Sequence, residues 1–350
     1  MPKICSVQTS VPEYKLSQTD AREYTRRFFT GKVSSLDRLL TVFDHAGIET
    51  RYFSVPPGWH EHHPTIEEKN KTYITAATDL CADASRRLMA QHNLGPHDID
   101  YIIYINTTGL ATPSIDARLI NVLSLRHDIH RTPIWGLGCA GGAAGLSHAY
   151  HYAIGHPDHR ILLVAAELCG LTFMPDDTSK SNIVATALFG EGAAAVLICG
   201  DAVDCDGLNI ISTQSNFYPD SLDVMGWNII SQGMQVVFDR RIPDIVAQNS
   251  KEDLTAFLRQ NSLTLEDIDQ FLFHPGGIKV VEAYEQALQP KDGQMILVRE
   301  TLRDFGNMSS VTVLFVLERY LSKFGVNREG YGLISALGPG FCSESLLVKL

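Results

Sequence analysis

Short apolar runs alternate with amphipathic stretches of helical period along the whole chain. Ser17, with Asp20 three residues later, predicts the start of a helix that ends near Thr30-Gly31. Further helices are expected over 72–92, 114–123 and 139–155. Apolar runs predict buried strands at 101–105, 161–166 and 193–199. Because strands and helices alternate, the pattern predicts the α/β fold class.

The second half of the chain repeats the plan of the first. Asp98-Ile99-Asp100 precedes the strand at 101–105, and Asp267-Ile268-Asp269, 169 residues further on, precedes an apolar run at 271–273. The same shift carries Cys139 to within one residue of Asn307, which also follows a glycine and opens a helical run at 311–321. The chain is therefore predicted to consist of two duplicated halves, 1–203 and 204–350, whose two helix starts face one another.

Composition excludes several function classes. The chain has 350 residues and a net charge of −11, which does not favour nucleic acid as a partner. No apolar run reaches the ~18 residues of a membrane span, and the start lacks the apolar stretch of a signal peptide. The seven cysteines are widely spaced without a CxxC pair, so neither a zinc site nor a disulfide framework is expected. These features favour a reducing cytoplasm.

Cys139 stands in the turn Gly136-Leu137-Gly138-Cys139-Ala140-Gly141-Gly142, after an apolar run and before a helical pattern. The N-terminus of a helix offers free N–H groups and a partial positive charge, which favour thiolate over thiol. This placement predicts a nucleophile. The alternative is a small buried hydrophobe, which is the interpretation for Cys81, Cys169, Cys199 and Cys205.

Two later motifs supply the partners that a nucleophilic cysteine needs. His274 follows a buried strand and precedes Pro275-Gly276-Gly277, so it is a candidate for proton transfer, with a satisfied core histidine as the alternative. Asn307, after Gly306, has an amide that donates hydrogen bonds at any pH and so suits an oxyanion, with a helix N-cap as the alternative.

Two other patterns are typical of different sites. Gly136-x-Gly138-x-x-Gly141 with Glu167, 26 residues on, matches a dinucleotide-binding fingerprint, but it leaves His274 and Asn307 unexplained. His60-Glu61-His62-His63 lacks the i, i+4 spacing of a helical zinc site and lies between prolines, so a solvated loop is expected there.

Taken together, the motifs resemble those of the type III polyketide synthases, the chalcone synthase family. The resemblance rests on Trp135 to Gly142, Phe189-Gly190-Glu191-Gly192, His274 to Gly277, Gly306 to Ser310 and Gly338-Pro339-Gly340-Phe341, in the family's order and spacing. It implies the thiolase fold, with two pseudo-symmetric αβαβα halves that form a five-layered core, and a homodimer. Residues 107–114 are similar to those of bacterial enzymes that make alkylpyrones from fatty acyl starters.

The resemblance also implies a mechanism. Cys139 accepts an acyl group from an acyl-CoA, and His274 keeps the thiol ionised. Malonyl-CoA loses CO₂, and His274 and Asn307 hold the oxygen of the resulting enolate, which attacks the acyl group on Cys139. The cycle repeats, and the chain closes to an alkylpyrone or alkylresorcinol. CoA thioesters are substrates, and no cofactor is implied.

Further site residues follow from the resemblance alone. Phe189 aligns with a gatekeeper between the CoA tunnel and the cavity, and Val236 stands where plant members have a second phenylalanine. The remaining substrate-binding positions are Thr172, Cys169, Thr112, Ser309, Gly338 and Pro339, of which Thr112 reaches across the dimer in relatives. Lys279 and Arg38 align with CoA contacts, whereas two further basic positions read Thr41 and His45 here.

Two alternative functions remain open from the sequence. A ketoacyl-acyl-carrier-protein synthase III also uses Cys, His and Asn, but it needs a basic surface for an acidic carrier protein, which a charge of −11 disfavours. A non-catalytic binding protein on the same fold is disfavoured by the presence of all three candidate catalytic residues.

Overall fold

The computed structural model describes residues 1–326 and 328–350, and a mixed sheet of nine strands runs through it in the order β11-β12-β13-β8-β1-β7-β6-β4-β5. These strands are β1 (Lys3–Ser10), β4 (Tyr101–Asn106), β5 (His130–Trp135), β6 (Arg160–Leu168), β7 (Glu191–Cys199), β8 (Leu208–Phe217), β11 (Ile268–Phe273), β12 (Tyr331–Gly338) and β13 (Cys342–Lys349). Strand β1 comes from the first half of the chain and β8 from the second. They join the two parts of the sheet, because Lys3 pairs with Asn209 and Ile4 with Leu208.

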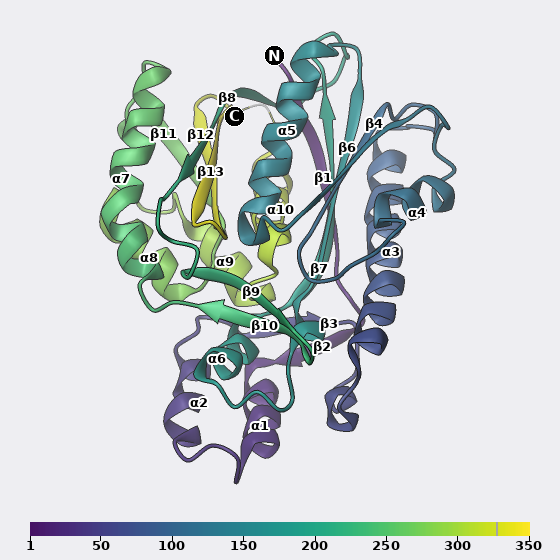
Figure 1. Cartoon of the computed structure of the whole chain (residues 1–350). Coiled ribbons are helices and arrows are strands. Elements are labelled where there is room, and N and C mark those ends of the chain that lie inside the picture. Colours follow the sequence, from purple (N-terminus) through teal and green to yellow (C-terminus); the bar gives the residue numbers. More distant parts are fainter. Residues whose placement is uncertain (327) are drawn as a thin grey trace.

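Helices form three layers around the two halves of the sheet. They are α1 (Gln18–Phe29), α2 (Leu36–Asp44), α3 (Ile66–Gln91), α4 (Ile115–Val122), α5 (Gly141–Gly155), α6 (Lys180–Leu188), α7 (Ile242–Gln260), α8 (Ile278–Leu288), α9 (Ile296–Phe305) and α10 (Thr312–Phe324). Figure 1 shows α5 and α10 between the two sheet halves, α3 outside the first half, and α7 and α8 outside the second. This α-β-α-β-α order confirms the predicted thiolase fold.

Local signals explain where the helices begin. The Ser17 Oγ accepts a hydrogen bond from the Asp20 N–H at 3.1 Å, so α1 starts where the sequence predicts. Helix α3 starts earlier than predicted, at Ile66, because Thr65 and Glu68 form a capping box that exchanges hydrogen bonds in both directions.

The two central helices approach each other closely at their starts. The 3₁₀ turn η2 (Gly138–Ala140) leads into α5, and the 3₁₀ turn η5 (Ser309–Val311) leads into α10. A Cβ on Gly142 would lie 2.2 Å from the backbone oxygen of Ser310, so only glycine allows this approach. The two turns that carry Cys139 and follow Asn307 therefore contact each other, as the internal repeat predicts.

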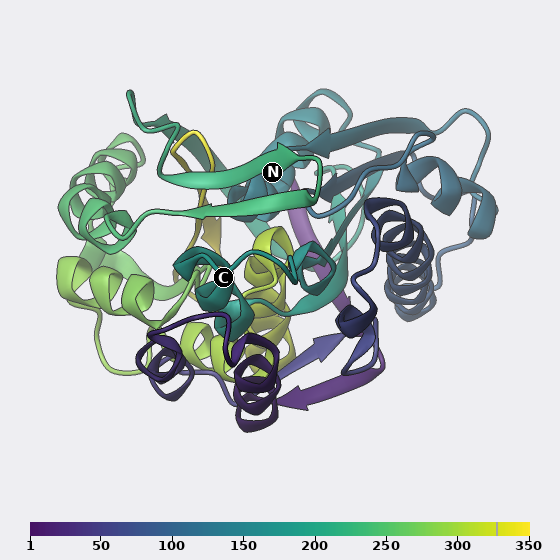
Figure 2. The same ribbon diagram turned by 60° about the horizontal axis from the view of Figure 1, so that its bottom comes forward.

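A smaller layer covers one end of the central helices. It consists of α1, α2, α6 and two antiparallel pairs, which are β2 (Tyr14–Ser17) with β3 (Thr50–Phe53) and β9 (Met225–Ile230) with β10 (Gly233–Phe238). Figure 2 looks onto this end and shows the β9–β10 hairpin crossing above α6. The remaining 3₁₀ turns are η1 (Trp59–His62), η3 (Cys169–Thr172) and η4 (Leu265–Asp267).

Two findings bear on the predictions from composition. No helix in 1–326 or 328–350 has both the length and the apolar character needed to cross a membrane. Cys5 and Cys205, 200 residues apart, are joined as a disulfide. The prediction of no disulfide is therefore wrong, because the spacing of cysteines along a chain does not reveal which of them the fold brings together.

Candidate active site

The turn η2 holds Cys139 between the two halves of the chain, facing Asn307. Gly136 and Gly138 have φ of +98° and +48°, and these left-handed values form the sharp turn out of β5. A Cβ on Gly138 would lie 2.6 Å from the Cδ of Pro339, so the turn also needs glycine for packing. The Cys139 side chain is 6% exposed, so the thiol faces the interior of the molecule.

Asn307 faces Cys139 from the pseudo-equivalent turn. The Cys139 Sγ lies 4.0 Å from the Asn307 Oδ1, which also accepts a hydrogen bond from the Ser309 N–H at 2.8 Å. The Asn307 Nδ2 donates to the Gly276 carbonyl at 2.9 Å. An amide nitrogen carries two hydrogens, so one remains free to donate to a bound oxygen.

His274 reaches the same place from the end of β11. Its backbone N–H donates to the Ser335 carbonyl at 2.8 Å, which fixes the residue beside β12. A Cβ on Gly276 would lie 3.6 Å from the His274 Nε2, so the imidazole lies beside the same glycine that binds the Asn307 amide. The side chain is 4% exposed, and neither ring nitrogen has a hydrogen-bond partner among the residues described. Two unpartnered buried nitrogens indicate a place for a ligand.

Burial changes the expected protonation of this pair. It raises the pKa of the Cys139 thiol to about 12, although hydrogen bonds with Ser309 and Asn307 work the other way, and it lowers the pKa of His274 to about 3. The helix terminus alone therefore does not keep the thiol ionised, contrary to the sequence-based expectation, because loss of solvation outweighs it. A thiolate here requires proton transfer to His274, so that the two opposite charges stabilise each other.

Replacing His274 with alanine is therefore expected to slow alkylation of Cys139 by iodoacetamide by ~100-fold or more near neutral pH, because the thiol keeps its raised pKa without a proton acceptor. The variant's rate should rise ~10-fold per pH unit without a plateau, since the thiolate fraction grows in that proportion below the pKa. Mass spectrometry of the Cys139 peptide measures the rate. An unchanged rate in the variant would mean that His274 does not control the thiol.

A largely apolar cavity lies on the side of Phe189 toward α1 and α6, next to the residues that surround Cys139 but not lined by Cys139, His274 or Asn307. Its walls combine residues from β2, β3, α1, η3, α6 and the β9–β10 hairpin. They include Leu16, Ala21, Phe53, Val55, Cys169, Thr172, Phe173, Ala185, Phe189, Trp227, Met234 and Val236. Phe189 closes the end nearest Asn307, because the two residues form a parallel bridge and the Gly190 N–H donates to the Asn307 carbonyl at 2.9 Å.

Four predicted substrate positions line this cavity, namely Cys169, Thr172, Phe189 and Val236. Although Val236 is smaller than the phenylalanine of plant members, the predicted gatekeeper Phe189 still has aromatic neighbours. The ring of Phe189 lies 5.4 Å from that of Phe238, two residues beyond Val236 on β10, and 5.9 Å from that of Trp227.

Other predicted positions lie elsewhere. The Ser309 N–H donates to the Asn307 Oδ1, and Gly338 and Pro339 pack against η2, so these three residues surround the catalytic residues and do not line the cavity. Thr112 is exposed on the single chain.

Lys279, near the start of α8, and Arg38, on α2, are both exposed. A Cβ on Gly47 would lie 3.2 Å from Ile278, so the segment after α2 packs beside the start of α8. Both predicted CoA contacts therefore belong to elements that meet at the surface. Their role in binding CoA stays a prediction.

Side-chain placement decides the interpretation of Glu167 and of the histidine cluster. Both carboxylate oxygens of Glu167 are occupied inside the protein, by Thr107, Thr108 and Ser310, so this residue cannot hold a ribose. Two of the three fingerprint glycines pack against protein atoms, Gly138 against Pro339 and Gly141 against Ile105, and so do not face a bound pyrophosphate. His60 does not belong to a solvated loop as predicted, because its ring lines the cavity beside Phe173, whereas His62 and His63 are exposed.

Arg51 is a residue that the sequence analysis missed. It is 1% exposed, and its Nη1 donates to the carbonyls of Thr186 and Phe189, each at 2.7 Å, while its Nη2 donates to the Gln18 Oε1 at 2.9 Å. A Cβ on Gly306 would lie 2.8 Å from the Arg51 Cδ. Arg51 therefore binds the carbonyls at the end of α6 and at Phe189 and packs against Gly306, the residue before Asn307. A single arginine in a strand gives no sequence signal for this.

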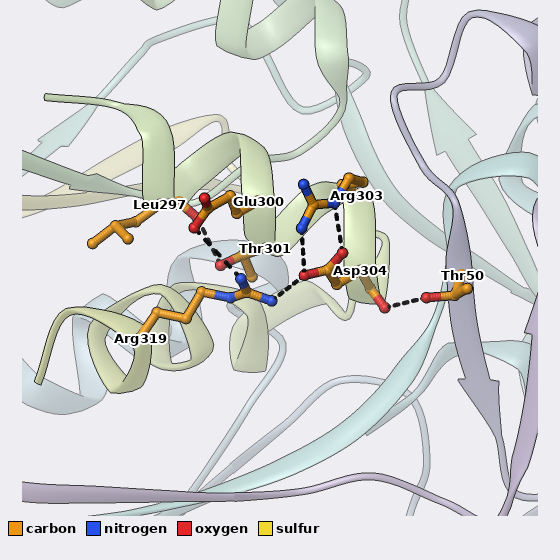
Figure 3. A network of polar contacts seen from close by, with 7 residues as sticks. All are labelled: Thr50, Leu297, Glu300, Thr301, Arg303, Asp304 and Arg319. Carbon is orange, nitrogen blue, oxygen red and sulfur yellow. Dashed lines mark hydrogen bonds and ion pairs between the residues drawn. The ribbon is translucent and has the colours of Figure 1, made fainter. Parts of the chain in front are cut away.

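A second polar network holds α9, the helix that leads into Gly306-Asn307. Figure 3 shows Asp304 between Arg303 and Arg319, with N–O distances of 2.7 and 2.5 Å. The Thr50 Oγ1 donates to the Asp304 carbonyl at 2.9 Å, so β3, which also carries Arg51, is tied to the end of α9. The backbone that precedes Asn307 is thus fixed from two sides.

Comparisons with known proteins agree with this geometry. Residues 1–202 match the family model of the N-terminal domain of chalcone and stilbene synthases, and residues 209–350 match that of the C-terminal domain. A Bacillus subtilis (strain 168) protein named "Putative chalcone synthase" is 40% identical over 99% of this chain and 98% of its own length. The 1,3,6,8-tetrahydroxynaphthalene synthase of Streptomyces peucetius subsp. caesius is 35% identical over 99% of this chain and 92% of its own length. The crystal structure of the Streptomyces coelicolor A3(2) enzyme of that name, a bacterial type III polyketide synthase, superposes with a TM-score of 0.94 at 28% identity over 99% of both chains.

Proposed function

The chain belongs to the chalcone and stilbene synthases, the acyl-transferring type III polyketide synthases, and from that premise we propose that it extends a fatty acyl-CoA starter with malonyl-CoA and releases an alkylpyrone or alkylresorcinol. The family assignment replaces the ketoacyl-acyl-carrier-protein synthase III alternative. The proposed identity of the starter and of the product is argued from the apolar cavity.

The proposed chemistry assigns one role to each catalytic side chain. The Cys139 thiol gives its proton to His274 and attacks the acyl-CoA carbonyl, which forms a thioester and releases CoA. Malonyl-CoA then loses CO₂, and the enolate oxygen receives hydrogen bonds from the His274 Nε2 and the free hydrogen of the Asn307 Nδ2. The enolate carbon attacks the thioester, so a carbon–carbon bond forms as Cys139 leaves as thiolate. No cofactor is needed, because CO₂ release drives the condensation.

The observation that carries the fatty-starter proposal is the cavity behind Phe189. Its lining is mostly aliphatic and aromatic, and its small residues Cys169 and Thr172 leave space beside Phe189. An alkyl chain gains ~0.8 kcal/mol for each CH₂ that leaves water, so such a cavity favours long starters over short ones.

The direct test is incubation of the purified enzyme with palmitoyl-CoA and malonyl-CoA, without carrier protein, and mass spectrometry of the products. Extended, cyclised products from palmitoyl-CoA support the proposal. A product from malonyl-CoA alone, with fatty starters ignored, would overturn the starter and keep the family activity. No product from any starter in a panel of chain lengths would overturn the catalytic assignment, and activity that requires malonyl carrier protein would restore the ketoacyl synthase alternative.

Replacing Val236 with phenylalanine should shift starter preference toward shorter chains. The larger ring would enter the cavity beside Phe189, and losing room for even one methylene is worth ~10-fold or more in a hydrophobic pocket. The ratio of kcat/KM for palmitoyl-CoA to that for hexanoyl-CoA measures the shift. Val237→Phe is the matched control, because neighbouring strand residues face opposite sides and Val237 does not line the cavity. An equal shift in both variants would count against the cavity as the starter site.

The proposal includes a homodimer with Thr112 at the subunit interface. Leu110 and Trp135 are large apolar residues that are 56% and 47% exposed, and the Trp135 Nε1 donates to the carbonyl of Gly109, close to Thr112 in sequence. A second copy of the chain would cover them. Sedimentation equilibrium tests this, and a monomer at all concentrations would contradict it.

A further inference from the structure

Three cysteine sulfurs meet at the end of the sheet that lies farthest along β7 from the catalytic site. The Sγ atoms of Cys5, Cys199 and Cys205 lie within 4.8 Å of one another, and this is the single group of three candidate metal-ligating side chains in residues 1–326 and 328–350. Cys5 stands at a register shift in β1, and Cys199 ends β7. Cys205 lies on the link from β7 to β8, at the junction between the two halves of the chain.

The surroundings of the cluster suit a group of negative charge. Cys5 and Cys199 are buried, whereas Cys205 is half-buried and gives access from solvent. The Lys3 Nζ donates to the Cys205 carbonyl at 2.8 Å. Lys3 on β1 and Arg160 on β6 both stand opposite Cys199 in the register of the sheet, and the Arg160 backbone N–H donates to the carboxylate of Asp100.

We propose that Cys5, Cys199 and Cys205, once reduced, bind one Zn²⁺ ion through three thiolates, with a fourth position open to solvent beside Cys205. Zinc bonds to thiolate at ~2.3 Å in tetrahedral sites, which places neighbouring sulfurs ~3.8 Å apart and needs little movement here. Three thiolates and Zn²⁺ together carry one negative charge, which the cations Lys3 and Arg160, opposite Cys199 in the sheet, would balance. Thiolate ligands favour zinc over the hard cations Mg²⁺ and Ca²⁺.

The site exists in two chemical states. In the structure Cys5 and Cys205 are joined as a disulfide, which leaves Cys199 as a thiol. A dithiol reductant supplies two electrons and two protons to that bond and becomes a cyclic disulfide itself. Zn²⁺ then displaces the three thiol protons. Zinc would join β1, β7 and the link between the two halves.

The test uses the full-length protein, reduced with dithiothreitol under anaerobic conditions, freed of reductant, and titrated with ZnCl₂ or with CoCl₂ as a spectroscopic probe. One equivalent of zinc per chain and a sulfur-to-cobalt charge-transfer band are expected. Cys199→Ser should weaken zinc binding by ~100-fold or more, since one of three ligands is lost. Cys81→Ala is the matched control, because Cys81 is an equally buried free cysteine that belongs to no group of three metal-ligating side chains in the described chain, and the variant should bind zinc like wild type.

Bound zinc should also protect the cluster from oxidation. It should block re-formation of the Cys5–Cys205 disulfide by oxidised glutathione, which mass spectrometry of the linked peptide detects. The proposal is overturned if the reduced protein takes up no zinc, if Cys199→Ser binds as much zinc as wild type, or if Cys139→Ala abolishes uptake. In the last case the metal would lie on the catalytic thiol. Thermal unfolding of each variant shows whether it is folded, so that a loss of zinc is not a loss of structure.

Discussion

Replacing Asn307 with alanine is expected to lower malonyl-CoA decarboxylation by ~100- to 1,000-fold, because one preorganised donor to a developing oxyanion is worth ~3–4 kcal/mol. Acyl loading should change by less than ~10-fold, because Cys139 and His274 remain in place and Asn307 contacts the thiol only through an oxygen 4.0 Å away. Release of ¹⁴CO₂ from labelled malonyl-CoA measures the first step, and mass spectrometry of the acyl-enzyme measures the second.

Cys139→Ala is the reciprocal control for this separation. It should abolish the acyl-enzyme and every extended product, whereas decarboxylation should persist, because His274 and Asn307 still hold the enolate oxygen. Equal loss of both partial reactions in Asn307→Ala would contradict the role assigned to the amide. Unchanged product formation in Cys139→Ala would restore the non-catalytic interpretation or require another nucleophile.

Periodicity and glycine placement predicted the parts of the fold that local sequence controls. The strands at β4, β6 and β7 and the helix starts at Ser17 and Ser114 agree with the structure to within a few residues. The internal repeat predicted that the turns of Cys139 and Asn307 would face one another, and Gly142 allows that contact. The β9–β10 hairpin gave no such signal, because its half-exposed strands lack a clear alternation.

The catalytic residues were predictable from motifs, but their energetics were not. A cysteine at a helix start suggests a low thiol pKa, whereas burial among residues of both halves, Glu167 on one side and Asn307 and Ser309 on the other, raises the pKa of Cys139. The cavity wall draws on segments from Tyr14 to Val236, so no local pattern could delimit it. Arg51 was missed and His60 was wrongly assigned to a solvated loop for the same reason, since each acquires its role from distant parts of the chain.

The buried guanidinium of Arg51 connects Phe189, the predicted gatekeeper, with the segment that carries Asn307, the predicted oxyanion donor. Burial lowers its pKa to about 9, so the guanidinium stays charged at neutral pH although no carboxylate in 1–326 or 328–350 forms an ion pair with it. Its charge is instead held by two carbonyls near the end of α6 and by the amide oxygen of Gln18. The carbonyl end of a helix carries partial negative charge, which favours a cation there.

Replacing Arg51 with methionine is expected to lower the free energy of unfolding by about 3 kcal/mol. Three hydrogen bonds to a charged group are lost and buried carbonyls stay unpaired, whereas relief of the buried charge offsets part of that loss. Urea unfolding measures the change. Arg126→Met is the control, because Arg126 lies at the surface and its ion pairs, one with the exposed Asp128 and one with the partly buried Asp100, are worth ~1 kcal/mol or less each.

The same variant should separate positioning from stability. In the folded fraction of Arg51→Met, decarboxylation is expected to fall ~10- to 100-fold, because a displacement of about 1 Å in the segment before Asn307 misplaces the amide. Alkylation of Cys139 should keep its rate, since η2 packs against Pro339, whereas the hydrogen bonds of Arg51 go to α6, Phe189 and Gln18. Arg51→Lys keeps the charge but not the planar fork, so it should recover stability more than decarboxylation. If decarboxylation and alkylation fell together in proportion to the unfolded fraction, Arg51 would support the fold without positioning Asn307.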